Sequence, residues 1–427
     1  MDNLLKQNQN LQQAVNELKV LNDIATAISS LNKVEDIIDQ IVLKCIKHLK
    51  VEEGTVSLLN EDENSEEFHT MIRHRDTSAS ELPIHLDSRL KGWMFKNRSV
   101  LMSNNIYEDP RFSSLNSDKQ PFDSILCVPL IVKDKLIGYL AAFNKKENTF
   151  FTDQDRRLLS IIASQSAQVI ENARLYEEEK ALIGLKNEMK MAQEIQIKLL
   201  PEETPRINGI DIAALNKPAK EVGGDYYDFL KVDSNKWGFC IGDITGKGMP
   251  AALLMANLQA TFRSQAIISR KCSDCLRGTN YMLYQSTEVT KFATFFYGVL
   301  HQENGQTILS YSNGGHDPPI LYKKDTNPQF LEATGLLLGV FENSEYSETS
   351  INLDAGDVLF MYTDGITEAF NRKGVDFGLD RLVELVGKNR NSSADEIMNL
   401  VLHSVENHVD EAPPSDDITM IIIKIKQ

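Results

Sequence analysis

Apolar residues near the start of the chain recur at helical spacings. Leu4, Leu11, Leu18 and Ala25 repeat every seven positions, with Ala14, Leu21 and Ile28 at the complementary positions. This repeat is typical of a short coiled coil. A plain amphipathic helix that covers the following domain fits the same residues, and both interpretations stay open. Apolar side chains from Ile37 to Ile46 then predict a second amphipathic helix.

Residues 51–152 mix strand and turn signals. Gly54 to Leu59 reads as a strand and is followed by a charged turn. Two longer apolar runs, residues 124–132 and 136–144, are joined by Lys133, Asp134 and Lys135. Two such runs with a short polar connection predict a β-hairpin.

A long helix is predicted for residues 153–200. Thr152 or Asp153 can cap its start, and an apolar face runs along Leu158, Ile162, Val169, Tyr176 and Ile183. Around Gly184 the apolar positions move to a second series, Leu182, Leu185, Met189, Ala192 and Leu199, which Gln196 interrupts. The pattern predicts a coiled coil that joins two domains, with Gly184 at a change of register. One uninterrupted helix that packs on its own domain is the alternative.

Acidic residues stand at the ends of four predicted strands in the second half of the chain. They are Asp225, Asp243, Asp364 and the pair Asp416–Asp417. One such Asp is ordinary turn chemistry, but four suggest carboxylates that converge. Converging carboxylates repel one another unless a cation neutralises them, and carboxylate and carbonyl oxygens are the ligands that hard divalent cations prefer.

Six short motifs follow one another in residues 199–425. They are Val-Gly-Gly-Asp-Tyr-Tyr-Asp (222–228), Gly-Asp-Ile-Thr-Gly-Lys-Gly (242–248), Ala-Thr-Phe-Phe-Tyr-Gly (293–298), Ser-Asn-Gly-Gly-His-Asp-Pro-Pro (312–319), Tyr-Thr-Asp-Gly-Ile-Thr-Glu (362–368) and Asp-Asp-Ile-Thr (416–419). In this order they resemble the metal-dependent Ser/Thr protein phosphatases, in their bacterial SpoIIE-like branch. Any one motif is weak evidence, whereas the ordered set is specific. The resemblance implies an α-β-β-α sandwich.

The same resemblance implies a catalytic centre with two Mn²⁺ or Mg²⁺ ions. Asp243 would bridge the ions and the Ile244 carbonyl would be a ligand. Asp364 and Asp416 would hold one ion, and Asp225 would act directly or through a water. Asp417 competes with Asp416 for its place. The catalytic set is therefore Asp225, Asp243, Asp364 and Asp416.

The general acid for the leaving group is unassigned on this basis. Many relatives carry a His after the Asp-Gly of the second motif, whereas this chain has Ile244 and Thr245 after Asp243. His316 is a candidate by residue type, but a structural role in its turn is the favoured interpretation.

Residues 33–152 resemble a GAF sensory domain, chiefly at residues 127–130, 136–140 and 150–153. The resemblance implies a sensor that could bind a small molecule. Trp93, Phe95, Tyr107 and Phe112 could line a pocket, although core packing is the favoured role for these aromatic residues. Cys127 is expected in the core.

Composition narrows the choice of partners and compartment. The chain has 427 residues, 42% of them hydrophobic, and a formal net charge of −16. That charge argues against nucleic acid and anionic membranes as partners. No signal peptide or membrane-spanning stretch is recognised, and five cysteines, an odd number, fit a reducing cytoplasm. Cys272 and Cys275 form a lone C-x-x-C pair and are interpreted as ordinary thiols.

Together these patterns predict an α+β protein with four segments. They are an N-terminal helix (1–32), a GAF domain (33–152), a linker helix (153–200) and a phosphatase domain (201–427). The expected function is a cytoplasmic, dimeric, sensor-regulated phosphatase that acts on a phosphorylated anti-sigma-factor antagonist or a similar protein. A catalytically inactive scaffold, or a ligand-sensing interaction module that acts through the coiled coil, is the alternative.

Overall fold

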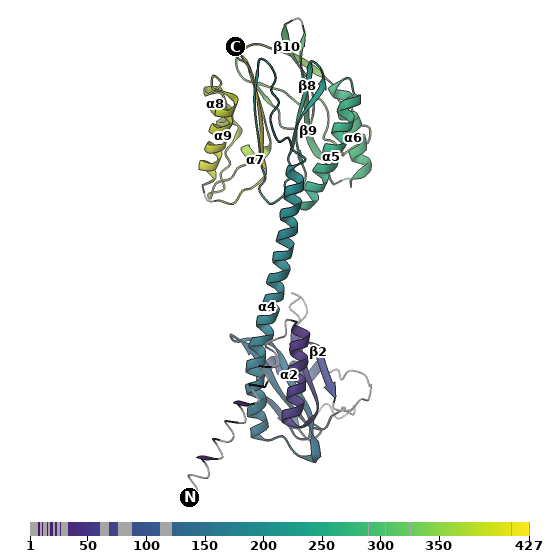
Figure 1. The fold of residues 1–427 in the computed structure, drawn as a ribbon, viewed down its shortest axis with the longest axis vertical. Helices are drawn as coiled ribbons and strands as arrows, with labels where there is room; N and C mark the ends of the chain where they lie inside the picture. Colours follow the sequence, from purple (N-terminus) through teal and green to yellow (C-terminus); the bar gives the residue numbers. More distant parts are fainter. Residues whose placement is uncertain are drawn as a thin grey trace. The chain divides into compact units, whose positions relative to one another are not determined.

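The chain divides into two compact units, Met1–Gly184 and Leu185–Gln427 (Figure 1). The computed structural model describes residues 33–59, 68–75, 88–111 and 122–426, apart from single positions 289, 304, 325 and 411, and scattered residues between 7 and 26. Within this described part, no helix is both long and apolar enough to cross a membrane.

The first unit is built on one antiparallel sheet. Its strands are β1 (Val51–Leu59), β2 (Phe68–Arg75), β3 (Leu101–Ser103), β4 (Ile125–Val132) and β5 (Lys135–Lys145), in the order β2-β1-β5-β4-β3. The turn between β4 and β5 has positive φ at Lys133 (46°) and Asp134 (65°). This backbone twist matches that of a tight hairpin, and the predicted hairpin is confirmed.

Helices cover both faces of this sheet. On one face, α2 (Val34–Leu49) and the first part of α4 (Asp153–Ile197) share a core with the strands. On the other face, α3 (Ser88–Asn97) contributes Met94 to a second core, which also holds Cys127 and Tyr139. Trp93 and Tyr107 pack against that core, whereas the side chains of Phe95 and Phe112 lie outside the described residues.

The start of α4 is held by its neighbours, as the sequence predicted for Thr152. The Thr152 hydroxyl accepts a hydrogen bond from the Asp155 amide, and the Asp155 carboxylate in turn pairs with Lys145. Leu159, Ile162 and Ile170 of α4 are buried in the first core. Further along, Leu182 and Leu185 are exposed.

The predicted coiled coil stays a prediction. Leu11 and Leu18 are exposed, and the other N-terminal heptad positions lie outside the described residues (Leu4, Ala14, Leu21, Ala25 and Ile28). The four-segment division of the chain likewise stays a prediction.

The second unit contains two antiparallel sheets. One has the order β13-β10-β9-β8-β7 and the other β12-β11-β14-β15-β6. The strands of the first are β7 (Tyr226–Asp233), β8 (Lys236–Ile244), β9 (Ala293–Glu303), β10 (Gln306–Gly314) and β13 (Thr349–Leu353). Those of the second are β6 (Ile210–Lys217), β11 (Ile320–Tyr322), β12 (Gln329–Phe330), β14 (Val358–Tyr362) and β15 (Ile418–Ile425).

The two sheets pack face to face. Their common core contains Ile241 and Phe296 from one sheet and Leu359 and Ile421 from the other. Two helices, α5 (Met249–Ile268) and α6 (Cys272–Ser286), cover the outer face of the first sheet. On the second sheet lie α8 (Leu379–Lys388) and α9 (Ala394–Val409), as Figure 1 shows. The predicted α+β class and the α-β-β-α sandwich are confirmed.

Candidate metal centre

Strand pairing brings the acidic positions to one end of the sandwich. Asp225 precedes β7 and Asp243 lies near the end of β8, where Tyr226 pairs with Gly242. In the other sheet, Asp364 opens the short helix α7 (Asp364–Thr367) directly after β14. Asp416 and Asp417 precede β15, whose first residues pair with the end of β14. Each sheet therefore delivers acidic side chains to the same edge.

Asp225 connects the two sheets. Its carboxylate Oδ2 accepts hydrogen bonds from the hydroxyls of Thr363, at 2.8 Å, and Thr419, at 2.6 Å. Both threonines belong to the opposite sheet edge, and Asp225 itself is buried, with 3% exposed. The sequence pattern did not predict a role for these hydroxyls, although both lie inside the motifs 362–368 and 416–419.

Asp417 and Asp416 have different surroundings. The Asp417 carboxylate accepts hydrogen bonds from the backbone amides of Ala219, at 2.8 Å, and Gly224, at 2.6 Å. Asp416 instead forms an ion pair with Lys247, with 2.8 Å between Nζ and Oδ2. Asp417 thus holds the backbone of a neighbouring loop, whereas Asp416 faces the ammonium group of the Lys247 side chain.

The carboxylates raise one another's pKa values. Burial, followed by the charges of Asp243 and Asp417, raises the pKa of Asp225 well above its ordinary range. Burial and the charges of Asp364 and Asp416 raise the pKa of Asp243 to about 7. Burial and Asp416 likewise raise the pKa of Asp364 to about 6. Carboxylates that resist ionisation in this way are stabilised when a cation joins them.

The backbone near Asp243 comes unusually close to the opposing loop. A Cβ atom added to Gly224 would lie 2.9 Å from the Ile244 carbonyl oxygen. Gly246 and Gly248 have positive φ, 98° and 74°, so the turn that leads into α5 uses conformations that favour glycine. The Ile244 carbonyl therefore lies close to the loop that carries Asp225.

The donor set suits hard divalent cations, but it is not a preassembled ligand cage. Carboxylates from two sheets and a nearby backbone carbonyl are the groups that Mg²⁺ and Mn²⁺ prefer. Among the described residues, no three His, Cys, Asp or Glu side chains are already grouped as metal ligands.

His316 is buried beside the end of β8. Its Nδ1 lies 2.8 Å from the Thr294 hydroxyl, which accepts a hydrogen bond from the Asp243 amide at 3.2 Å. Burial lowers the pKa of His316 to about 4, so the ring is neutral at neutral pH. This arrangement positions the end of β8 and supports the structural interpretation of His316.

Charged neighbours of the site were not singled out from the sequence. The carboxylates of Glu368 and Asp317 contribute to the raised pKa of Asp364, and burial raises the pKa of Asp317 itself. Lys247 counters the acidic side chains through its ion pair with Asp416. All three residues lie inside motifs of the family resemblance, 242–248, 312–319 and 362–368, so the motifs are the signal that could have identified them.

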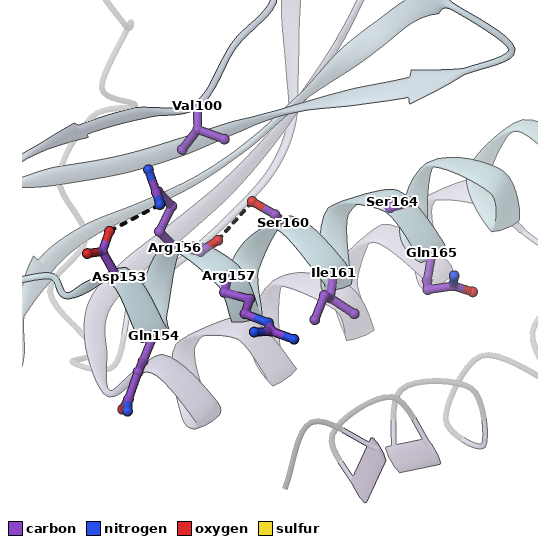
Figure 2. A pocket seen from close by; sticks show the side chains of 9 residues that line it. All are labelled: Val100, Asp153, Gln154, Arg156, Arg157, Ser160, Ile161, Ser164 and Gln165. Atoms are coloured by element: carbon purple, nitrogen blue, oxygen red, sulfur yellow. Dashed lines mark hydrogen bonds and ion pairs between the residues drawn. The ribbon is translucent and has the colours of Figure 1, made fainter. Parts of the chain in front are cut away.

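The first unit carries an open hollow of about 940 Å³ along α4. Figure 2 shows Arg156 paired with Asp153 at 3.2 Å and the Ser160 hydroxyl donating to the Arg156 carbonyl. The other lining residues are Val100, Gln154, Arg157, Ile161, Ser164 and Gln165. In the second core of this unit, burial raises the pKa of the Cys127 thiol well above its ordinary range, which fits a core residue.

Comparison with known proteins gives two family matches. Residues 233–426 match the family described as Stage II sporulation protein E (SpoIIE), and residues 32–171 match the GAF domain. The SiaA-PP2C domain of Pseudomonas aeruginosa is a solved structure similar to this chain, with a TM-score of 0.50 and 19% identity. The match covers 57% of this chain and 98% of that domain, and it shows the fold.

Two curated relatives are phosphatases by name. The chain is 31% identical to phosphoserine phosphatase RsbU of Bacillus subtilis (strain 168) over 258 residues, which are 59% of this chain and 75% of that protein. It is 26% identical to phosphoserine phosphatase RsbP of the same organism, over 57% of this chain and 59% of that protein. The chain therefore spans three quarters of one relative and less than two thirds of the other.

Proposed function

Because this chain belongs to the SpoIIE-type family of serine/threonine protein phosphatases and carries a GAF domain before its phosphatase domain, we propose that it is a sensor-regulated enzyme. Its substrate would be phosphoserine or phosphothreonine on a signalling protein. The observation that carries the proposal is the convergence of carboxylates from two sheets with raised pKa values. Carboxylates that are buried together repel one another, and a bound cation would relieve that repulsion.

In this proposal Asp225, Asp243, Asp364 and Asp416 hold two Mn²⁺ or Mg²⁺ ions, and the Ile244 carbonyl completes the donor set. Asp417 takes a positioning role, since its oxygens already accept backbone hydrogen bonds. Bound divalent ions would supply a water of lowered pKa as nucleophile and offset the charge of the phosphate.

The protein's own residues prepare this site. The hydroxyls of Thr363 and Thr419 orient the Asp225 carboxylate toward the cluster. The Thr294 hydroxyl fixes the backbone of Asp243. Lys247 places a positive charge beside Asp416, where it reduces repulsion of an incoming phosphate.

The substrate and assembly are further parts of the proposal. The SpoIIE-like resemblance favours a phosphorylated anti-sigma-factor antagonist or a similar protein, and the net charge of −16 disfavours nucleic acid. The GAF domain would bind a small molecule and regulate the enzyme. A homodimer through α4 is supported by exposed apolar residues such as Leu182 and Leu185. The five cysteines are free thiols, which suits a protein of the cytoplasm.

Hydrolysis of p-nitrophenyl phosphate and of a phosphoserine peptide tests the activity. The wild type should hydrolyse both with Mn²⁺ and lose both rates in EDTA. Asp243→Asn should lose almost all activity, at least about 100-fold, because no other group replaces a bridging carboxylate. Near wild-type rates for Asp243→Asn would contradict the two-ion assignment.

The alternatives predict different results in the same assays. A catalytically inactive scaffold would bind Mn²⁺ without turning over either substrate. If the first unit serves only as an interaction module, deletion of residues 1–184 should abolish partner binding and leave the hydrolysis rate of the remaining chain unchanged.

A further inference from the structure

Gln196 is buried at a position where the helix is otherwise exposed. Its neighbours Ile195 and Ile197 are 66% and 56% exposed, whereas Gln196 is 8% exposed. Isoleucine side chains are usually buried and glutamine side chains usually exposed, so this arrangement is the reverse of the usual one. A buried amide must find hydrogen-bond partners, so this inversion indicates a specific contact.

The Gln196 side chain pairs with both backbone groups of Gly223. Its Nε2 donates to the Gly223 carbonyl at 2.7 Å, and its Oε1 accepts from the Gly223 amide at 3.1 Å. The two bonds imitate the pairing of a neighbouring strand. They fix a residue that stands two positions before Asp225.

The opposite side of the same loop is held by Asp417. A Cβ atom added to Gly223 would lie 2.3 Å from the Asp417 carboxylate oxygen Oδ2, which also accepts from the Gly224 amide at 2.6 Å. Gly223 therefore fills the space between the Gln196 amide and the Asp417 carboxylate. Movement of either partner must displace the loop.

The end of α4 is itself anchored within the second unit. Gln259 of α5 donates from Nε2 to the Leu199 carbonyl at 3.2 Å. Gln259 is also buried. The segment that carries Gln196 is thus attached to the phosphatase fold at two points.

We infer that Gln196 is a positioning residue of the metal centre, which holds residues 223–225 so that Asp225 meets the other carboxylates. The inference rests on the proposed function for its link to metal binding. Residues that support metal ligands commonly change metal affinity by about 10–100-fold when they are replaced. We expect a loss of that order for Mn²⁺ when both hydrogen bonds of Gln196 are removed.

Three variants of the full chain test this role. Gln196→Met keeps the length of the side chain and removes both hydrogen bonds. Gln196→Glu keeps the acceptor for the Gly223 amide and removes the donor to its carbonyl. Gln193→Met is the matched control, because Gln193 lies one turn earlier on α4 and its side chain makes no hydrogen bond to any described residue.

Hydrogen exchange of the Gly223 amide and Mn²⁺ affinity by calorimetry are the two measurements. In Gln196→Met we expect faster exchange at Gly223 and Mn²⁺ binding about 10–100-fold weaker. Gln196→Glu should retain slow exchange, and the control should match the wild type in both. A merely structural residue would lower Tm and leave the Mn²⁺ affinity of the folded protein unchanged.

Two results would overturn the inference. The first is an unchanged rate of hydrogen exchange at Gly223 in Gln196→Met. The second is faster exchange at Gly223 together with a Mn²⁺ affinity equal to that of Gln193→Met. If the wild type bound no Mn²⁺, the proposed metal centre would fail separately, and the exchange data would still decide whether Gln196 holds the loop.

Discussion

The acidic residues of the site differ in what surrounds each carboxylate. Asp225 accepts from two threonine hydroxyls, Asp417 accepts from backbone amides, and Asp416 pairs with a lysine. Charge alone therefore does not assign their roles. The hydrogen-bond partners of Asp417 show that it holds the backbone, whereas the ion pair of Asp416 shows that its carboxylate faces a positive charge.

Replacing Asp417 should mainly lower stability, whereas replacing Asp416 should mainly lower activity. Asp417→Asn places an NH₂ group where backbone amides now donate, so we expect the free energy of unfolding to fall by about 1–3 kcal/mol. Asp416→Asn should change stability little, because its partner Lys247 is about half exposed, but it should abolish Mn²⁺-dependent turnover. Urea denaturation and p-nitrophenyl phosphate hydrolysis distinguish them, and the reverse ranking would contradict the assignment.

The raised pKa values also predict how the metal-free protein responds to pH. A carboxyl whose pKa is higher in the folded than in the unfolded state contributes stability at low pH. That contribution is lost as pH rises through about 6 for Asp364 and about 7 for Asp243. In EDTA, Asp243→Asn should therefore have a higher Tm than the wild type at pH 8.

The comparison at pH 5 is the control for that prediction. Both folded proteins then carry a neutral group at position 243, although Asp243 is already ionised in the unfolded wild type. The difference in Tm should therefore be smaller at pH 5 than at pH 8. A constant difference in Tm between pH 5 and pH 8 would show that the substitution acts through packing and not through charge.

Among the elements, strand ends were predictable and side-chain partners were not. Apolar runs next to Asp225, Asp243 and Asp364 located the strands, because a buried strand and its terminal turn have a local signal. Gln196 was seen only as an interruption of an apolar series. Its contact with Gly223 joins residues 27 positions apart, and such a contact depends on tertiary packing that no local pattern records.

An ion pair between the half-exposed Arg263 and the buried Asp228 joins α5 to β7. Asp228 is fully buried, and its Oδ2 accepts from Arg263 Nε at 2.7 Å and from the Tyr226 hydroxyl at 2.6 Å. Arg263→Met would leave the buried carboxylate with fewer donors. We expect the free energy of unfolding to fall by about 1–3 kcal/mol, measured by urea denaturation.

Arg277→Met on α6 is the matched control. Arg277 pairs with Asp274 at 3.1 Å, and both side chains are about half exposed. Surface pairs of this kind contribute about 0–1 kcal/mol. Equal losses in the two variants would argue that the Asp228 pair adds nothing through its burial.

For the whole molecule, the division at Gly184 falls inside α4. The same helix packs in the core of the first unit through Ile162 and contacts Gly223 of the second unit through Gln196. Its middle part carries apolar side chains exposed to solvent, among them Leu182 and Leu185. Burial of such residues against a second copy would stabilise an assembly.

We therefore expect the full chain to be a dimer in light scattering at micromolar concentration. Replacing both Leu182 and Leu185 by Glu should shift it toward monomer, because charges at apolar contact positions oppose association. Lys186→Glu, which changes the charge of the same segment without removing an apolar side chain, should stay dimeric. A monomeric wild type would contradict the prediction.

The Gln196 contact also limits how this chain could exchange its sensor during evolution or in protein engineering. A fusion placed after Gln196 would discard the side chain that holds Gly223, so the useful junction lies upstream, near Leu185. Each residue added there turns the following helix by about 100°, whereas seven residues return it to within about 20° of its starting direction. Recombinant sensors should thus be interchangeable in heptad steps, and a library of junction lengths should show activity with that periodicity.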